Sequence, residues 1–113
     1  MSLTIYRDGQ FVPDTQAGIS PFDRGFLYGD GLFETLRCYD GKFFRAERHF
    51  ARLKAGLDSL GISLPTTDWP WVLRELVAWN NVANGVARIV VTRGVGEFGL
   101  LGQQAQQPLV IAA

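Results

Sequence analysis

Apolar positions in the first 45 residues fall in short runs that are typical of β-strands. Residues 3–6 and 11–12 form two such runs on either side of the Asp-Gly pair at 8–9, the strongest short-range signal for a β-hairpin. A second Asp-Gly pair at 40–41 follows the apolar run at 32–39 in the same way. Two hairpins this close together predict an antiparallel sheet.

The period of the apolar positions lengthens to that of a helix after residue 45. Residues 46–60 predict an amphipathic helix that ends at Gly61. Its expected buried stripe consists of Phe50, Leu53, Leu57 and Leu60. A second helix is expected after Thr66, Thr67 and Asp68, whose side-chain oxygens can cap its first turn. Its expected buried face consists of Trp69, Val72, Leu73, Leu76 and Val77.

The last third of the chain returns to strand character. Residues 86–92 are β-branched and almost continuously apolar, which predicts a strand in the centre of a sheet. A glycine-rich loop at 94–102 and a final strand at 108–113 follow, and because the chain stops within that strand we expect further sequence in the parent protein. The expected fold is α+β, with two N-terminal β-hairpins in a mainly antiparallel sheet and two helices packed on it, forming one domain over residues 1–113.

Composition and charge exclude several classes of partner. A chain of 113 residues with 47% apolar and 19% charged side chains is a single globular domain. Its 11 basic and 11 acidic side chains cancel, so nothing favours nucleic acid or an anionic membrane, and no apolar run is long enough for a membrane span. A lone Cys38 in an apolar strand fits a buried thiol in a reducing compartment. We therefore expect a cytoplasmic protein.

Common catalytic constellations are missing from the sequence. One histidine and one cysteine leave no cluster with metal-ligand spacing, so no metal site is expected. His49 lies on the flank of the first helix's apolar stripe and is interpreted as a packed or capping residue. The loop at 94–102 lacks the lysine and hydroxyl residue of a phosphate-binding P-loop.

Three features remain as candidates for function. The bend at 29–31, Gly-Asp-Gly with aromatic residues on both sides, is either a pocket wall or a plain turn between core segments. Arg48 and Arg52 are four residues apart on the first helix, which suits either an anion bound between them or an ordinary solvated basic face. Arg88 interrupts an apolar strand, so we expect it to be buried and paired either with a substrate carboxylate or, across the sheet, with Glu34 or Asp30.

A set of separated motifs then agrees with one family. The motifs are Asp-Arg-Gly at 23–25, Tyr-Gly-Asp-Gly-Leu-Phe-Glu at 28–34, Arg37, His-Phe-Ala-Arg-Leu at 49–53 and Thr-Arg-Gly at 92–94. In this order and spacing the chain resembles the class IV pyridoxal-phosphate enzymes, the fold-type IV group of branched-chain and D-amino-acid aminotransferases and aminodeoxychorismate lyases. The resemblance runs from about residue 3 to the end and covers only that family's N-terminal domain.

The resemblance implies roles for four residues. Arg52 would bind the phosphate of pyridoxal 5′-phosphate, and Arg88 would bind the substrate α-carboxylate. Tyr28 and Phe33 would line the substrate pocket, with Tyr28 serving the other subunit's site in a homodimer. The small-molecule partners would be an amino acid and a 2-oxo acid.

Two departures from the family qualify these implications. D-amino-acid aminotransferases carry an Arg-x-His pair where this chain has Phe98 and Leu100, which favours an L-type, branched-chain-like aminotransferase; aminodeoxychorismate lyase is the alternative. The Schiff-base lysine of the family is absent, since neither Lys42 nor Lys54 matches its position, so no catalytic residue is assigned. We expect the 113 residues alone to be inactive and not to hold the cofactor stably; a non-catalytic binding or dimerisation module of the same fold is the other reading.

Overall fold

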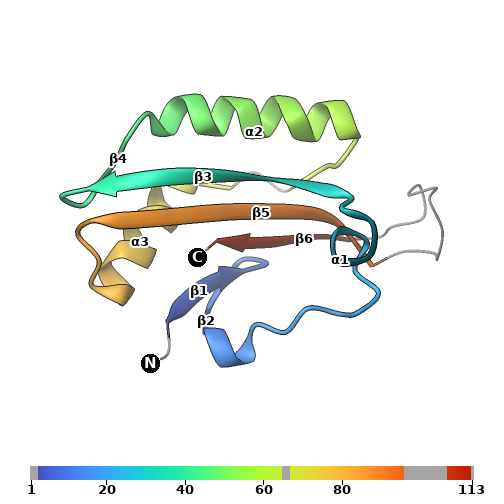
Figure 1. Ribbon diagram of the computed structural model, residues 1–113, viewed down its shortest axis with the longest axis horizontal. Coiled ribbons are helices and arrows are strands. Elements are labelled where there is room, and N and C mark those ends of the chain that lie inside the picture. Colours follow the sequence, from blue (N-terminus) through green and yellow to red (C-terminus); the bar gives the residue numbers. More distant parts are fainter. Residues whose placement is uncertain (1–2, 65–66, 96–106, 113) are drawn as a thin grey trace.

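A six-stranded sheet forms the centre of the computed structural model, which describes residues 3–64, 67–95 and, for the backbone, 107–112. The strands are β1 (Thr4–Arg7), β2 (Gln10–Pro13), β3 (Gly31–Tyr39), β4 (Lys42–Phe43), β5 (Gly85–Val95) and β6 (Gln107–Ala112). Their order is β2-β1-β6-β5-β3-β4 and every pairing is antiparallel, as expected (Figure 1). The strand expected at 86–92 is indeed central, between β6 and β3.

Both Asp-Gly hairpins form where the sequence predicts them. The central residues of the first turn, Asp8 and Gly9, have φ angles of 48° and 91°. Those of the second, Asp40 and Gly41, have φ angles of 52° and 79°. Positive φ at both central residues suits the right-handed twist of the flanking strands, and aspartate followed by glycine tolerates it well.

The helices are α1 (Arg24–Tyr28), α2 (Ala46–Leu60) and α3 (Trp69–Asn80), with a short 3-10 turn at Asp14–Gln16. Gly61, with a φ of 70°, caps the C-terminus of α2. Asp68 caps the N-terminus of α3, because its carboxylate accepts a hydrogen bond from the Trp71 backbone at 3.2 Å. None of the helices within the described ranges has both the length and the apolarity needed to cross a membrane.

The core lies between one face of the sheet and helices α2 and α3. It contains Leu36, Leu53, Leu57, Val72, Leu73, Leu76, Ala87, Ile89 and Val91. Leu60, expected in the buried stripe, is instead 40% exposed. It is the last residue of α2, and the turn at Gly61 brings Ile62 into the core in its place.

The opposite face of β3 and β5 is much more open. Along β3, alternate residues from Leu32 to Cys38 point toward the helices, while Phe33 and Tyr39 on the other face are more than half exposed. Val86 on β5 is 53% exposed in the same way. The apolar sequence of β5 therefore does not mean equal burial on both sides. Cys38, on the helix side, is a buried free thiol as predicted.

Candidate functional site

The bend at 29–31 connects helix α1 to strand β3 and is fixed at both ends. Asp23 caps α1, because its Oδ1 accepts hydrogen bonds from the backbone N–H groups of Gly25 and Phe26 at 2.8 and 3.3 Å. The helix ends at Gly29, whose φ is 66°. The backbone is therefore fixed on both sides of the bend, by the end of α1 before it and by strand β3 after it.

A close approach of backbones holds this bend against β5. A Cβ atom on Gly31 would collide with the carbonyl oxygen of Val91 and would lie 2.9 Å from the Cα of Thr92, so glycine is required there. Beside it, the buried Thr92 hydroxyl donates to Asp23 Oδ2 at 2.9 Å and accepts from the Gly94 N–H at 3.0 Å. The cap of α1 and the end of β5 are thus one hydrogen-bonded unit.

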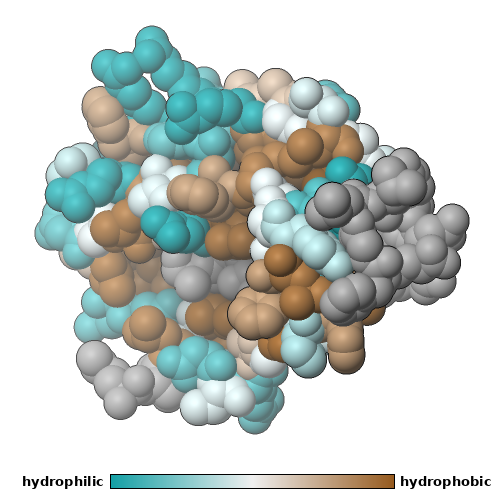
Figure 2. All heavy atoms as spheres, turned by 45° about the vertical axis from the view of Figure 1, so that its right-hand side comes forward, coloured by the Kyte–Doolittle hydropathy of each residue, from teal (hydrophilic) through white to brown (hydrophobic). Residues whose placement is uncertain are grey.

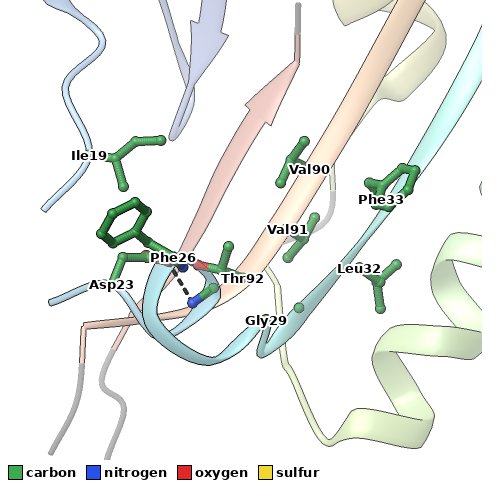
Figure 3. A pocket seen from close by; sticks show the side chains of 11 residues that line it. Ile19, Asp23, Phe26, Gly29, Leu32, Phe33, Val90, Val91 and Thr92 are labelled. Atoms are coloured by element: carbon green, nitrogen blue, oxygen red, sulfur yellow. Dashed lines mark hydrogen bonds between the residues drawn. The ribbon is translucent and has the colours of Figure 1, made fainter. Parts of the chain in front are cut away.

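A pocket of ≈ 500 Å³ lies against this unit, and its walls are mostly apolar. Figure 3 shows Ile19 and Phe26 on one side of it, Val90 and Phe33 on the other, and the Asp23 cap beside Thr92 at its base. Gly29 and Gly31 also line it. Of the two alternatives left open by the sequence, the bend is therefore a pocket wall.

The side chain of Arg52 on α2 is paired with Glu34 on β3. The Arg52 Nε and Nη2 groups donate to the Glu34 Oε2 and Oε1 atoms, both at 2.8 Å, in a two-point contact. Glu34 is only 5% exposed, whereas the Arg52 side chain is 71% exposed. The anion expected near Arg52 is thus supplied, at least on one edge of the guanidinium, by the protein itself.

His49 joins the same cluster. Its Nδ1 lies 2.7 Å from Glu34 Oε1, so the residue interpreted as packed or capping also contacts a buried carboxylate. The hydrogen bond from Arg52 lowers the pKa of the Glu34 carboxyl most strongly; burial opposes this, and the contact with His49 adds to the lowering. Glu34 is therefore an anion that fixes one edge of Arg52 and leaves its other N–H groups accessible for a second anion.

A second charged cluster surrounds Asp30 in the bend. Asp30 Oδ2 accepts from Arg24 Nε at 2.9 Å and from Arg93 Nε at 2.8 Å. Burial by itself would raise the pKa of Asp30, but the hydrogen bonds and charges of Arg93 and Arg24 outweigh it and the pKa is lowered. Asp30 is consequently a structural anion that ties α1 to the end of β5.

Arg88 lies differently from the expectation. It is exposed on the open face of β5, opposite Thr35 of β3, whereas Glu34 points to the helix side. Its Nε is 3.3 Å from the Thr35 hydroxyl and its guanidinium carbon lies 4.7 Å from the centre of the Phe33 ring. The expected burial and the salt bridge to Glu34 or Asp30 are wrong, because strand alternation places Arg88 on the opposite face from Ala87 and Ile89, which are buried in the core.

The predicted site residues therefore fall into separate groups. Phe33 lines the pocket and Arg88 stacks on its ring, so these two are brought together. Arg52 belongs to the Glu34 cluster on the helix side, and neither it nor Tyr28 is among the described residues that line the pocket. Phe98 and Leu100 lie outside the described residues. No group of three or more potential metal ligands was found within the described ranges.

The profile of the family described as amino-transferase class IV matches residues 31–113, so the chain belongs to the class IV aminotransferase family. A protein of Methanocaldococcus jannaschii with the provisional name branched-chain-amino-acid aminotransferase is 41% identical over 110 residues, covering 96% of this chain and 38% of the relative. Other relatives are named D-alanine aminotransferase and aminodeoxychorismate lyase. The chain thus spans 33% to 38% of the length of these curated relatives.

Solved structures give the same result for the fold. The 4-amino-4-deoxychorismate lyase of Pseudomonas aeruginosa is 38% identical with a TM-score of 0.72, over 96% of this chain and 38% of that one. The branched-chain aminotransferase of the archaeon Thermoproteus uzoniensis, solved with norvaline, is 24% identical with a TM-score of 0.84, over 100% of this chain and 40% of that one. Another branched-chain aminotransferase, solved with pyridoxamine 5′-phosphate, is also 24% identical and has a TM-score of 0.87, over 100% of this chain and 39% of that one. The expected α+β fold of the fold-type IV enzymes is therefore confirmed.

Proposed function

We propose that residues 1–113 are the N-terminal domain of a pyridoxal-phosphate-dependent aminotransferase that moves an amino group between an L-amino acid, branched-chain-like, and a 2-oxo acid. The observation that carries this is Arg52, whose guanidinium Glu34 holds at one edge while 71% of the side chain stays exposed. A pre-oriented, accessible guanidinium suits a phosphate group, because its planar fork matches two oxygens. Family membership and the relative from Methanocaldococcus jannaschii support the same activity.

The donor set of the described residues fits part of a pyridoxal-phosphate site. Arg52 would hold the phosphate, and the branched-chain aminotransferase solved with pyridoxamine 5′-phosphate supports a cofactor of this type. When bound, pyridoxal phosphate supplies an electron sink for the carbanion that forms at the substrate α-carbon. The lysine that the family uses at this cofactor would come from a C-terminal domain outside these 113 residues.

The remaining roles belong to the open face and the bend. Arg88 would bind the substrate carboxylate, with its guanidinium oriented by Thr35 and by the Phe33 ring. Phe33 would form part of the substrate pocket, which it already lines here.

Tyr28, at the end of α1, would serve the site of the other subunit in a homodimer. Phe22 and Phe26, 57% and 71% exposed, give the α1 region an apolar surface of the kind that subunit contacts cover, and apolar side chains show on this side of the molecule in Figure 2.

The test uses the longer cytoplasmic protein that we propose the reading frame encodes. Purified with pyridoxal phosphate, it should show the absorbance of bound cofactor and transfer the amino group of L-leucine or L-valine to 2-oxoglutarate. Arg52→Ala should weaken cofactor binding about ten- to hundredfold, since it removes charge-assisted hydrogen bonds. Arg74→Ala, an exposed arginine on α3, is the matched control and should leave binding unchanged. A reading frame that ends at Ala113, or a full-length protein that binds no pyridoxal phosphate, would favour the non-catalytic module.

Aminodeoxychorismate lyase is the second candidate. The lyase structure from Pseudomonas aeruginosa has 38% identity to this chain, close to the 41% of the aminotransferase relative, and this supports the second candidate. The two activities differ in product, because the lyase releases pyruvate from aminodeoxychorismate without an amino acceptor. Pyruvate formation without transamination by the full-length protein would replace the first proposal with the second.

A further inference from the structure

Arg24 is the most deeply buried cation among the described residues. It is 2% exposed, although it is the first residue of the five-residue helix α1 near the surface. A guanidinium removed from water is costly unless partners replace its hydration. Two such partners are Asp30, which accepts from Nε at 2.9 Å, and the Tyr28 ring, whose centre lies 4.7 Å from the guanidinium carbon. Arg24 therefore connects a charged cluster to an aromatic ring.

The charged cluster is also anchored to β5 and to the end of α2. Arg93 donates through its backbone N–H to the Asp30 carbonyl at 3.0 Å and through Nε to the Asp30 carboxylate at 2.8 Å. Its Nη2 also donates to the carbonyl oxygen of Leu60 at 2.8 Å. Contacts thus run from the end of α2 and from β5, through Asp30, to the Arg24 guanidinium. These contacts with α2 and β5 hold the Arg24 guanidinium in place.

The backbone around Tyr28 does little by itself to fix the position of the Tyr28 ring. It is the last residue of a helix too short to be stable by itself, and it precedes Gly29, which is in the left-handed conformation. The flat guanidinium next to its ring favours one ring orientation, since a cation is attracted to the face of an aromatic ring. The neighbouring Gly29 lines the pocket, whereas Tyr28 itself does not and is assigned above to the site of the other subunit.

We propose that Arg24 is a positioning residue, which holds the Tyr28 ring in the orientation needed for substrate contact and is itself held by Asp30. This rests on the proposed function, in which Tyr28 contacts substrate. Lysine cannot replace Arg24 fully, because a compact ammonium group lacks the flat surface that stacks on the ring and the fixed donor geometry toward Asp30.

The first experiment measures the ring directly in the 113-residue chain. The chain contains three tyrosines, so incorporation of 3-fluorotyrosine gives a simple ¹⁹F spectrum, and a Tyr28→Phe variant assigns the Tyr28 signal. Arg24→Lys and Arg24→Met should move the Tyr28 signal toward its position in the unfolded chain, while the signals of Tyr6 and Tyr39 stay in place. Arg74→Met is the matched control and should move none of them. An unchanged Tyr28 signal in Arg24→Lys, or in a folded Arg24→Met, overturns the proposal.

The second experiment measures the consequence in the full-length protein. Arg24→Lys should raise KM and lower kcat/KM about tenfold with kcat nearly unchanged, in parallel with Tyr28→Phe, while cofactor absorbance is retained. An equal loss of kcat and cofactor binding would show general disruption and overturn the positioning role. Absence of any aminotransferase activity in the unmodified protein would refute the proposed function instead, and the ¹⁹F result would still decide whether Arg24 orients the ring.

Discussion

The carboxylate of Glu34 binds the guanidinium of Arg52 through two hydrogen bonds of 2.8 Å, so a buried strand residue fixes the direction of an exposed helix residue. His49 binds one of the same carboxylate oxygens, at 2.7 Å. Because Glu34 is rigidly placed in β3, the accessible part of Arg52 has a defined orientation before any ligand arrives. Preorganisation of this kind reduces the entropy that binding costs.

Glu34→Gln tests the structural value of this pair. Glutamine keeps the shape of the side chain but removes the charge and one acceptor, so we expect the free energy of unfolding to fall by about 1–2 kcal/mol. Urea unfolding followed by tryptophan fluorescence measures it. Glu47→Gln, an exposed acid in the first turn of α2, is the control and should change stability by less than about 0.5 kcal/mol. Equal effects in the two variants would mean that the Glu34 contacts contribute nothing particular.

The acid sensitivity of the chain should depend on Glu34 and Asp30. Both have a pKa below the ordinary values of 4.5 and 3.8, so the unfolded state binds more protons than the folded state as the pH falls. Their contribution is fully present above about pH 5 and is lost as the pH falls through the lower, folded-state values. Accordingly, the stability difference between the wild type and Glu34→Gln should shrink as the pH falls from about 5 to about 3. A difference that grows over this acidic range would contradict the sign of the shift.

Gly31→Ala should destabilise the chain markedly. The added Cβ would collide with the Val91 carbonyl oxygen, and both partners are backbone of paired strands, which cannot move aside cheaply. We expect a loss of about 2–4 kcal/mol in the free energy of unfolding. Gly18→Ala is the control, because no atom lies within 4 Å of its added Cβ and its φ is not positive, so it should be neutral or slightly stabilising.

Arg88→Met tests whether the Arg88 side chain is exposed or buried. Arg88 is exposed, with a hydrogen bond to Thr35 and a cation–π contact with Phe33, so stability should change by less than about 0.5 kcal/mol. Its neighbour Ile89 is 0% exposed, and Ile89→Ala should cost about 2–5 kcal/mol in the same unfolding assay. If Arg88→Met approached the loss for Ile89→Ala, the arginine would be buried after all. In the full-length protein, Arg88→Met should raise KM for the amino acid while stability is kept.

Much of the fold follows from local sequence signals. The Asp-Gly turns, the helical period of α2, Gly61 and the Asp68 cap all act within a few residues, and each predicts its element correctly. Motif spacing likewise selects Phe33, which lines the pocket, whereas the role that it implies for Arg52 stays a prediction.

The pairings between elements do not follow from local signals. The contact between Arg52 and Glu34 joins positions 18 residues apart, and that between Arg93 and Asp30 joins positions 63 apart. Strand alternation does predict that Glu34 has a partner. Glu34 falls at an inward position of β3 between Leu32 and Leu36, where a buried charge requires one. The burial expected for Arg88 is wrong because an apolar strand sequence does not show which face of the sheet is covered by helices.

Phe33 lines the pocket from the open face of β3, while the residues on either side of it point toward the core. Its side chain is 58% exposed and is absent from the packed core cluster. Position 33 can therefore be varied in size and polarity, for example to Leu, Ser or Trp, with little effect on folding. Position 33 is thus a place where the shape of the pocket and the stability of the domain can be adjusted independently.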